Sequence, residues 1–245
     1  MTDTTAAAAT LTLPDGEPQA GPWTAVPVAE LAGLLLEGSD DVRGRPWVIA
    51  IDGRSGAGKS TLVERLLPHV GPGAVVHIDD ISWNEPMYEW GHLLAEHVLE
   101  PLHRGEAVGF RPPAWAEHGR DGALEIPAGL RCVLVEGTGA NQRELAHLID
   151  RTVWIQADHQ LAEHRGIARD IDQGVNGDTE ESRRFWHWWM SHELPFFARE
   201  RPGERADGVV CGTPSAVGVE VGQAEDDVVW AAGPLGGAVA GTEAE

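Results

Sequence analysis

The sequence predicts an α/β protein: a three-layer sandwich in which helices cover both faces of a five-stranded parallel sheet, with a helical lid beside it. Short apolar, β-branched runs alternate with helical patterns along most of the chain, as expected for a parallel sheet that is buried on both faces. A glycine-rich segment follows the first of these runs directly. In such sheets ligands bind at the carboxyl ends of the strands, so the residues after each run are the place to look for chemistry.

The expected elements follow one another in a regular order. Apolar runs that predict strands occupy 47–51, 74–78, 132–135, 152–155 and 208–211. Patterns typical of helices start at Lys59, cover 90–103, cover 142–148 as a short element, start again at His159, and cover 180–199 as a longer element. Since each strand run is followed by a helical pattern, the connections are expected to be crossovers between parallel strands.

Composition divides the chain into one domain and two tails. Residues 1–22 and 214–245 are rich in Gly, Ala and acidic residues and have little periodicity, so we expect mobile tails there. Residues 23–213 are long enough to form a single domain with its own core. No internal repeat interrupts this segment.

The charge and the cysteines limit the classes of partner and compartment. The formal net charge of −21 argues against nucleic acid as a partner. Cys132 and Cys211 each lie within a predicted strand and form no metal or redox motif, which fits a reduced, cytoplasmic compartment. The first 20 residues lack the pattern of a signal peptide, and no run approaches the ~18 apolar residues of a membrane span, so no membrane association is expected. A homo-oligomer is left open.

The strongest motif is the segment from Gly53 to Ser60, with the sequence GRSGAGKS. It matches the phosphate-binding P-loop pattern and lies between a predicted strand and a predicted helix, as that pattern requires. The expected nucleotide-binding residues are Gly53, Arg54, Ser55, Gly56, Ala57, Gly58, Lys59, Ser60 and Thr61. Lys59 would stabilise the β- and γ-phosphates of ATP, and Ser60 would ligate Mg²⁺. Asp52, just before the loop, is interpreted as a residue that ends the strand, and a place near the metal ion is the alternative.

Carboxylates follow two other predicted strands. The run 75–78 is followed by Asp79 and Asp80, and the run 133–135 by Glu136. Phosphoryl transfer to a hydroxyl needs a carboxylate near the acceptor and a further group near the metal ion. Along an extended chain, adjacent side chains point in opposite directions, so we expect only one of Asp79 and Asp80 to face the acceptor. Solvated strand ends or helix caps are the alternative for each acid.

From about residue 47 to 213, the chain resembles the uridine kinase and phosphoribulokinase family within the P-loop NTPase superfamily. The resemblance rests on the P-loop, on Ile78-Asp79-Asp80, on 115–120, on 134–137 and on Arg169-Asp170-Ile171, in that order. It implies a nucleoside-kinase-like fold with strand order 2-3-1-4-5. It also implies Asp80 as the catalytic base, with Asp79 as a reserve beside the substrate, and Glu136 as the metal-associated acid.

The same resemblance implies a substrate-recognition segment. The family pattern Y-D-F-x-x-H-x-R corresponds here to 113–120, in which His118 and Arg120 are retained while the tyrosine and aspartate are replaced. After R-D-I, this chain has DQGVN where the family commonly has E-R-G-R. The resemblance therefore implies His118 and Arg120 as substrate-binding residues, and it leaves the identity of the substrate open.

Two further features lie on the helices that would form the lid. Arg165 and Arg169 are four residues apart and would share one helix face directed at the triphosphate, with Arg169 as a catalytic residue and pairing with a nearby acid as the alternative. In the aromatic segment 185–190, the spacing of Trp186, Trp189 and Met190 favours a face packed on the core, and a wall for a substrate is the alternative. The histidines form no zinc-binding pattern.

Together these features predict an ATP- and Mg²⁺-dependent kinase that phosphorylates a hydroxyl group of a small molecule. A kinase for a non-nucleoside metabolite such as a sugar, a sugar acid or a natural product is an alternative. So is a regulatory switch that hydrolyses a nucleotide, although the sequence contains no N-K-x-D or D-x-x-G motif after a strand.

Overall fold

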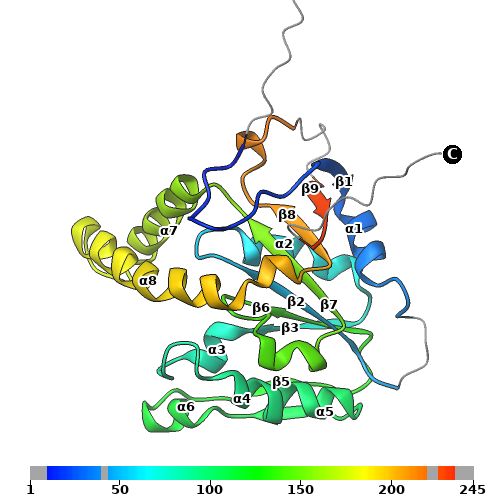
Figure 1. Ribbon diagram of the computed structural model, residues 1–245. Helices are drawn as coiled ribbons and strands as arrows, with labels where there is room; N and C mark the ends of the chain where they lie inside the picture. The colour runs from blue at the N-terminus through cyan, green and yellow to red at the C-terminus, as the bar shows by residue number, and fades with distance from the viewer. Residues whose placement is uncertain (1–9, 40–43, 220–225, 235–245) are drawn as a thin grey trace, which may run out of the picture.

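The computed structural model describes residues 10–39, 44–219 and 226–234. Its centre is a seven-stranded sheet with the order β1-β9-β8-β7-β2-β6-β3 (Figure 1). Strands β4 and β5 pair antiparallel in a second, two-stranded sheet. The strands are β1 Thr24–Pro27, β2 Trp47–Gly53, β3 Gly73–His77, β4 Val108–Phe110, β5 Leu124–Ile126, β6 Cys132–Glu136, β7 Arg151–Gln156, β8 Gly208–Cys211 and β9 Asp227–Ala232.

Helices of several kinds connect these strands. The α-helices are α1 Val28–Leu35, α2 Lys59–Leu66, α3 Ile78–Ser82, α4 Gly91–Leu94, α5 Glu100–His103, α6 Pro113–Glu117, α7 His159–Gln173 and α8 Thr179–Glu200. The 3-10 helices are η1 Leu67–His69, η3 Arg143–Leu148, η4 Pro202–Glu204 and η5 Pro214–Ala216, and η2 Ala95–Leu99 is a π-helical turn between α4 and α5. The helix expected over 90–103 is therefore present with a π turn at its centre.

The predicted parallel sheet is confirmed, including its order. Strands β3, β6, β2, β7 and β8 pair in parallel, which is the order 2-3-1-4-5 of the five expected strands. Four strands were not expected: β4 and β5 of the small sheet, and β1 and β9 of the main sheet. β9 pairs with β8, and β1 with β9, both antiparallel, so they extend the sheet at one edge.

Alternate residues of the central strands separate two cores, as the period of two along a strand requires. Ile49, Leu134 and Val153 belong to the core beneath α1 and α2, whereas Val48 and Val133 belong to the core beneath α4, η2 and α5. On this second face, the end of α8 covers the neighbouring strands, where Phe196 and Phe197 pack near Trp154 and Val209. The chain thus forms the three layers that the sequence predicts (Figure 1).

Both predicted tails are wrong within the described residues. In the N-terminal tail, 10–22 packs on the domain: Leu11 is buried, and the backbone of Thr12 bonds to Asp158 and His159. In the C-terminal tail, 227–232 is the sheet strand β9. The rest of these tails, 1–9, 220–225 and 235–245, lies outside the described residues.

Among the helices of the described residues, none is long and apolar enough to cross a membrane.

Candidate functional site

The P-loop connects the end of β2 to the start of α2, and its glycines determine its shape. Gly56 and Gly58 have positive φ values of 74° and 106°, which residues with a side chain rarely adopt. A Cβ atom at Gly56 would lie 2.1 Å from the carbonyl oxygen of Ala162 in α7. The loop therefore packs directly against the backbone of α7, and only glycine fits at this position.

Lys59 begins α2 and folds back over the loop. Its Nζ atom donates to the carbonyl oxygens of Gly53 and Arg54 at 3.0 and 3.1 Å, and to Thr138 Oγ1 at 3.2 Å. Lys59 is also the only lysine of the sequence. The ammonium group is therefore held at the mouth of the P-loop, where it can stabilise the charge of a bound phosphate.

Ser60 and Glu136, expected from the sequence to lie near the metal ion, are brought together. Ser60 Oγ lies 3.2 Å from Glu136 Oε1, and His77 Nδ1 lies 2.9 Å from Glu136 Oε2. Burial would raise the pKa of Glu136, but the His77 hydrogen bond and the charge of Lys59 outweigh it, and the pKa is lowered. A hydroxyl oxygen and an ionised carboxylate are the hard oxygen donors that Mg²⁺ prefers, so these residues fit that ion.

Asp52 has a structural role at the end of its strand, in line with the sequence interpretation. Its carboxylate accepts hydrogen bonds from the backbone N–H groups of Gly53, Gly139 and Asn141 at 2.7 to 3.0 Å. Complete burial raises its pKa to about 6 in spite of these bonds. The residue thus ties the end of β2 to the loop after β6.

Two cavities have Lys59 in their lining. One, of about 550 Å³, is lined by the P-loop, Arg165 and the segment 210–214, and also by β9. The other, of about 410 Å³, lies between α3, the end of β6, and the two long helices α7 and α8. Lys59, Ser60 and Arg169 line both cavities, so the two spaces meet at the lysine and hydroxyl of the P-loop.

The two arginines of α7 reach these cavities, as their spacing predicted. Arg165 donates to the carbonyl oxygen of Gly212 at 2.7 Å. Arg169 bonds to the neighbouring Asp170 at 2.9 and 3.1 Å, and Asp170 also accepts from Asn176. Both the phosphate-facing role and the pairing with an acid considered for Arg169 are therefore compatible with its position.

The structure separates Asp79 from Asp80 and corrects their setting. The strand β3 ends at His77, so both acids lie in the first turn of α3 and not on an extended strand end. Asp79 lines the 410 Å³ cavity together with Lys59 and Glu136. Asp80 is outside this lining and forms an ion pair with Arg120. Of the two acids, Asp79 is therefore the one that lies in the lining of the cavity beside Lys59.

The other expected substrate residues lie beside Asp80 and outside the lining of both cavities. The guanidinium of Arg120 stacks on the ring of Trp115 at 3.6 Å, and the Trp115 indole donates to the carbonyl oxygen of Asp80 at 2.8 Å. His118 packs edge-on against Trp83 with the ring centres 5.8 Å apart. These contacts account for His118 and Arg120 as parts of a local cluster that fixes α3 and α6.

Of the predicted nucleotide-binding residues, Arg54 directs its side chain elsewhere. Its guanidinium bonds twice to Glu17 in the N-terminal segment and lines neither of the two cavities at Lys59. Within the P-loop, Arg54 can therefore contribute its backbone to phosphate binding, but its side chain faces the other way.

The aromatic segment of α8 is divided between core and cavity. Trp186 and Met190 are buried, and Trp186 packs so closely on Gly166 of α7 that a Cβ there would lie 2.0 Å from its ring. This confirms the core role expected for those two residues. Trp186 and Trp189 also line the 410 Å³ cavity, and Trp188 is exposed.

Sequence reasoning missed Glu193. It is fully buried, and its carboxylate accepts from Ser55 Oγ at 2.7 Å, from Ser55 N at 3.1 Å, and from Trp189 Nε1 at 2.9 Å. It therefore ties α8 to the P-loop. The sequence pattern could have indicated a buried acid at this position, since Glu193 shares a helix face with Trp186, Met190 and Phe197.

The geometry can be compared with known proteins. No model of a protein family matches the chain, and no curated protein matches it. Among solved structures, a "putative fructose transport system kinase" from Silicibacter sp. TM1040 is similar, with 21% sequence identity, a TM-score of 0.51, and coverage of 71% of this chain and 93% of that one. A "possible uridine kinase" from Bacillus stearothermophilus has 19% identity, a TM-score of 0.46, and coverage of 74% and 96%.

The first of these similarities shows the fold. The chain has an α/β fold with a mostly parallel central sheet, similar to that of the first of these structures.

Proposed function

We propose that this protein is an ATP-dependent kinase that transfers the γ-phosphoryl group to a hydroxyl group of a small molecule. The observation that carries the proposal is the meeting of two cavities at Lys59, Ser60 and Arg169. A donor in one cavity and an acceptor in the other would face each other across these groups. Direct transfer between two bound substrates requires this arrangement.

The 550 Å³ cavity suits the nucleotide. Its P-loop backbone and the start of α2 provide N–H groups for the phosphates. Arg165 and the segment after β8 line its outer part. Ser60 and Glu136 would hold Mg²⁺, which neutralises phosphate charge in such reactions.

The 410 Å³ cavity suits the acceptor. Its ionisable residues are three acids and two bases, Asp79, Glu136 and Asp170 against Lys59 and Arg169, so it offers no surplus positive charge for an anionic compound. The rings of Trp186 and Trp189 and the amide of Asn176 complete its lining. Aromatic faces with carboxylate and amide groups suit an uncharged polyhydroxyl compound better than a sugar acid.

In the proposed reaction, Asp79 accepts the proton of the acceptor hydroxyl as its oxygen bonds to the γ-phosphorus. The bond between this phosphorus and the bridging oxygen breaks, and ADP leaves. Lys59 and Arg169 stabilise the negative charge on the transferring group, and the P-loop holds the donor in line.

One observation favours a non-nucleoside acceptor. Arg120, which the family resemblance assigns to substrate recognition together with His118, is paired with Asp80 and is not in the lining of the acceptor cavity. We therefore rank uncharged sugars and other polyols above nucleosides as acceptors.

A screen of ADP release tests the proposal. Nucleosides, uncharged sugars and sugar acids are each incubated with Mg·ATP and the protein, and we expect at least one uncharged compound to raise ADP release tenfold or more. Lys59→Ala should lower that rate by roughly 10² or more while the protein stays folded. ADP release that no small acceptor changes, and that only a protein partner stimulates, would support the regulatory switch instead.

A further inference from the structure

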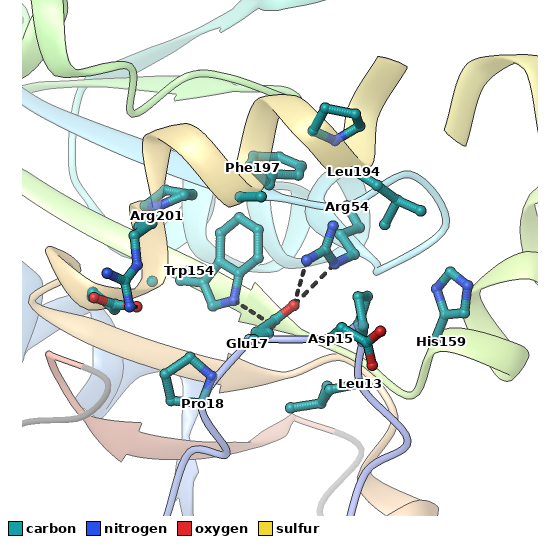
Figure 2. A pocket seen from close by; sticks show the side chains of 17 residues that line it. Leu13, Asp15, Glu17, Pro18, Arg54, Trp154, His159, Leu194, Phe197 and Arg201 are labelled. Carbon is teal, nitrogen blue, oxygen red and sulfur yellow. Dashed lines mark hydrogen bonds and ion pairs between the residues drawn. The ribbon is translucent and has the colours of Figure 1, made fainter. Parts of the chain in front are cut away.

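A third cavity, of about 710 Å³, has Arg54 as its one lining residue from the P-loop. It is lined by the N-terminal segment 13–18, Arg54 and the end of α8 with η4 (Figure 2). It shares no lining residue with either cavity at Lys59. Neither substrate of the proposed reaction would therefore occupy it.

The walls of this cavity are mainly apolar. Trp154 and Phe197 are 2% and 4% exposed, and their rings meet edge to face with centres 4.9 Å apart. Leu13 and Leu194 face them, together with several prolines (Figure 2). An apolar, aromatic lining and a volume of several hundred Å³ are typical of sites for small molecules.

The N-terminal wall is held in place by hydrogen bonds to the sheet. Glu17 Oε1 accepts from Trp154 Nε1 at 3.1 Å and from Gln156 Nε2 at 3.0 Å. The backbone N–H of Ala20 donates to Gln156 Oε1 at 2.8 Å, and that of Thr12 donates to Asp158 at 2.9 Å. These hydrogen bonds fix the N-terminal wall of the cavity, and a fixed wall lowers the entropic cost of binding.

One polar group in the lining lacks a partner. Arg54 Nε and Nη2 donate to Glu17 Oε2 at 3.0 and 2.5 Å, but Nη1 is buried without a hydrogen-bond partner among the described residues. In Figure 2 the guanidinium lies between Glu17 and the side chains of Leu194 and Phe197. Because a buried donor without a partner is costly, an oxygen acceptor from a ligand would be bound here with a gain in free energy.

The charges in the lining favour an uncharged ligand. Arg54 is paired with Glu17, and Arg201 with Glu204, both at 2.5 Å. The remaining acid of the lining is Asp15, so an anionic ligand would meet a net negative surrounding. We propose that this cavity is a second ligand site, for an uncharged aromatic compound with a carbonyl or amide oxygen that accepts from Arg54.

Three matched probes test the proposal on the full chain: indole-3-carboxamide, indole-3-carboxylate and indole, each titrated at millimolar concentration by ligand-observed NMR. We expect the carboxamide to bind most tightly, since the carboxylate adds a charge and indole lacks the acceptor. Saturating Mg·ADP should leave the carboxamide bound, because the cavities share no residue.

Variants that fill the cavity test whether the carboxamide binds there. Ala198 is an exposed lining residue on α8, so Ala198→Trp fills the cavity from its rim and should weaken carboxamide binding at least tenfold. Ser191→Trp, at an exposed position of the same helix outside the lining, should bind as the wild type does. Leu194→Trp is a second cavity-filling variant in case Ala198→Trp does not fold, which thermal melting will show.

Three results would each overturn the proposal: no binding of the carboxamide to the wild-type protein, unchanged binding in a folded cavity-filling variant, or displacement by Mg·ADP. Binding of the carboxylate as tight as that of the carboxamide would refute the charge selection.

Discussion

Two neighbouring acids, Asp79 and Asp80, have different surroundings in this fold. Asp79 lines the cavity with Lys59 and Glu136, whereas Asp80 is neutralised by Arg120. The sequence predicted that only one acid of the two would face the acceptor, and this is consistent with their positions. The family resemblance favoured Asp80 as the base, whereas in the structure the strand ends at His77 and both acids lie in the first turn of α3.

The acids can be distinguished by mutation. Asp79→Asn should lower kcat by roughly 10² with nearly unchanged affinity for Mg·ATP, because an amide keeps the size of the side chain but cannot accept the proton. Asp80→Asn is the matched control and should retain most of kcat. Turnover with the acceptor found by screening, and separate titrations of Mg·ATP, measure both effects. A larger loss of kcat in Asp80→Asn would return the base role to that residue.

A second residue-scale prediction concerns pH. The hydrogen bond that His77 donates to Glu136 raises the pKa of His77 above its ordinary value, so the folded state binds the proton more tightly than the unfolded state. The resulting stabilisation is complete below the unfolded pKa of about 6.5 and is lost as pH rises through the folded pKa. Because the His77 side chain is 51% exposed, we expect this pair to contribute only about 0.5 kcal/mol to the free energy of unfolding.

Urea unfolding of His77→Asn should therefore show lower stability than the wild type at pH 6 and a smaller difference at pH 9. His92→Asn is the control, since the His92 ring bonds to a backbone carbonyl at 3.1 Å instead of a carboxylate. A difference for His77→Asn that grows from pH 6 to pH 9 would contradict the assigned ion pair.

At the scale of elements, the five parallel strands and the P-loop were predictable because each is encoded locally, by a β-branched run or by a glycine spacing. Ser60 and Glu136 were predictable as neighbours because the carboxyl ends of parallel strands meet at one sheet edge. Strands β1 and β9 were not, because β1 is only four residues long and β9 follows an acidic stretch. Their pairing depends on the sheet already being formed.

The docking of the N-terminal segment was not predictable from the sequence either, because it depends on single side chains and not on a periodic pattern. Glu17 is the main contact, and its side chain is 10% exposed. Glu17→Ala would leave Arg54, Trp154 and Gln156 without the acceptor they share. We expect a loss of about 3 kcal/mol in the free energy of unfolding.

Chemical denaturation measures this loss, with Asp15→Ala as the control, since Asp15 is an exposed acid two residues away. A change below about 0.5 kcal/mol in Glu17→Ala, similar to the control, would mean that the segment does not stabilise the domain.

At the scale of the whole molecule, the long helices connect the binding surfaces. Gly56 of the P-loop packs on α7, Glu193 of α8 bonds to Ser55, and Phe197 near the end of α8 lines the third cavity. The acceptor cavity is thus formed by the same helices that fix the P-loop. In the proposed function, this arrangement would let a chain with a net charge of −21 bind ATP, since Lys59, Arg165 and Arg169 line one cavity.

The central claim is that a phosphoryl group passes directly from one of the two cavities lined by Lys59 to a hydroxyl in the other. Phosphorus-31 NMR of the protein with Mg·ATP and the acceptor found by screening tests it most directly. We predict a phosphate monoester resonance that grows in step with ADP, and that is lost in Lys59→Ala. Growth of inorganic phosphate alone, in step with ADP, would contradict the claim.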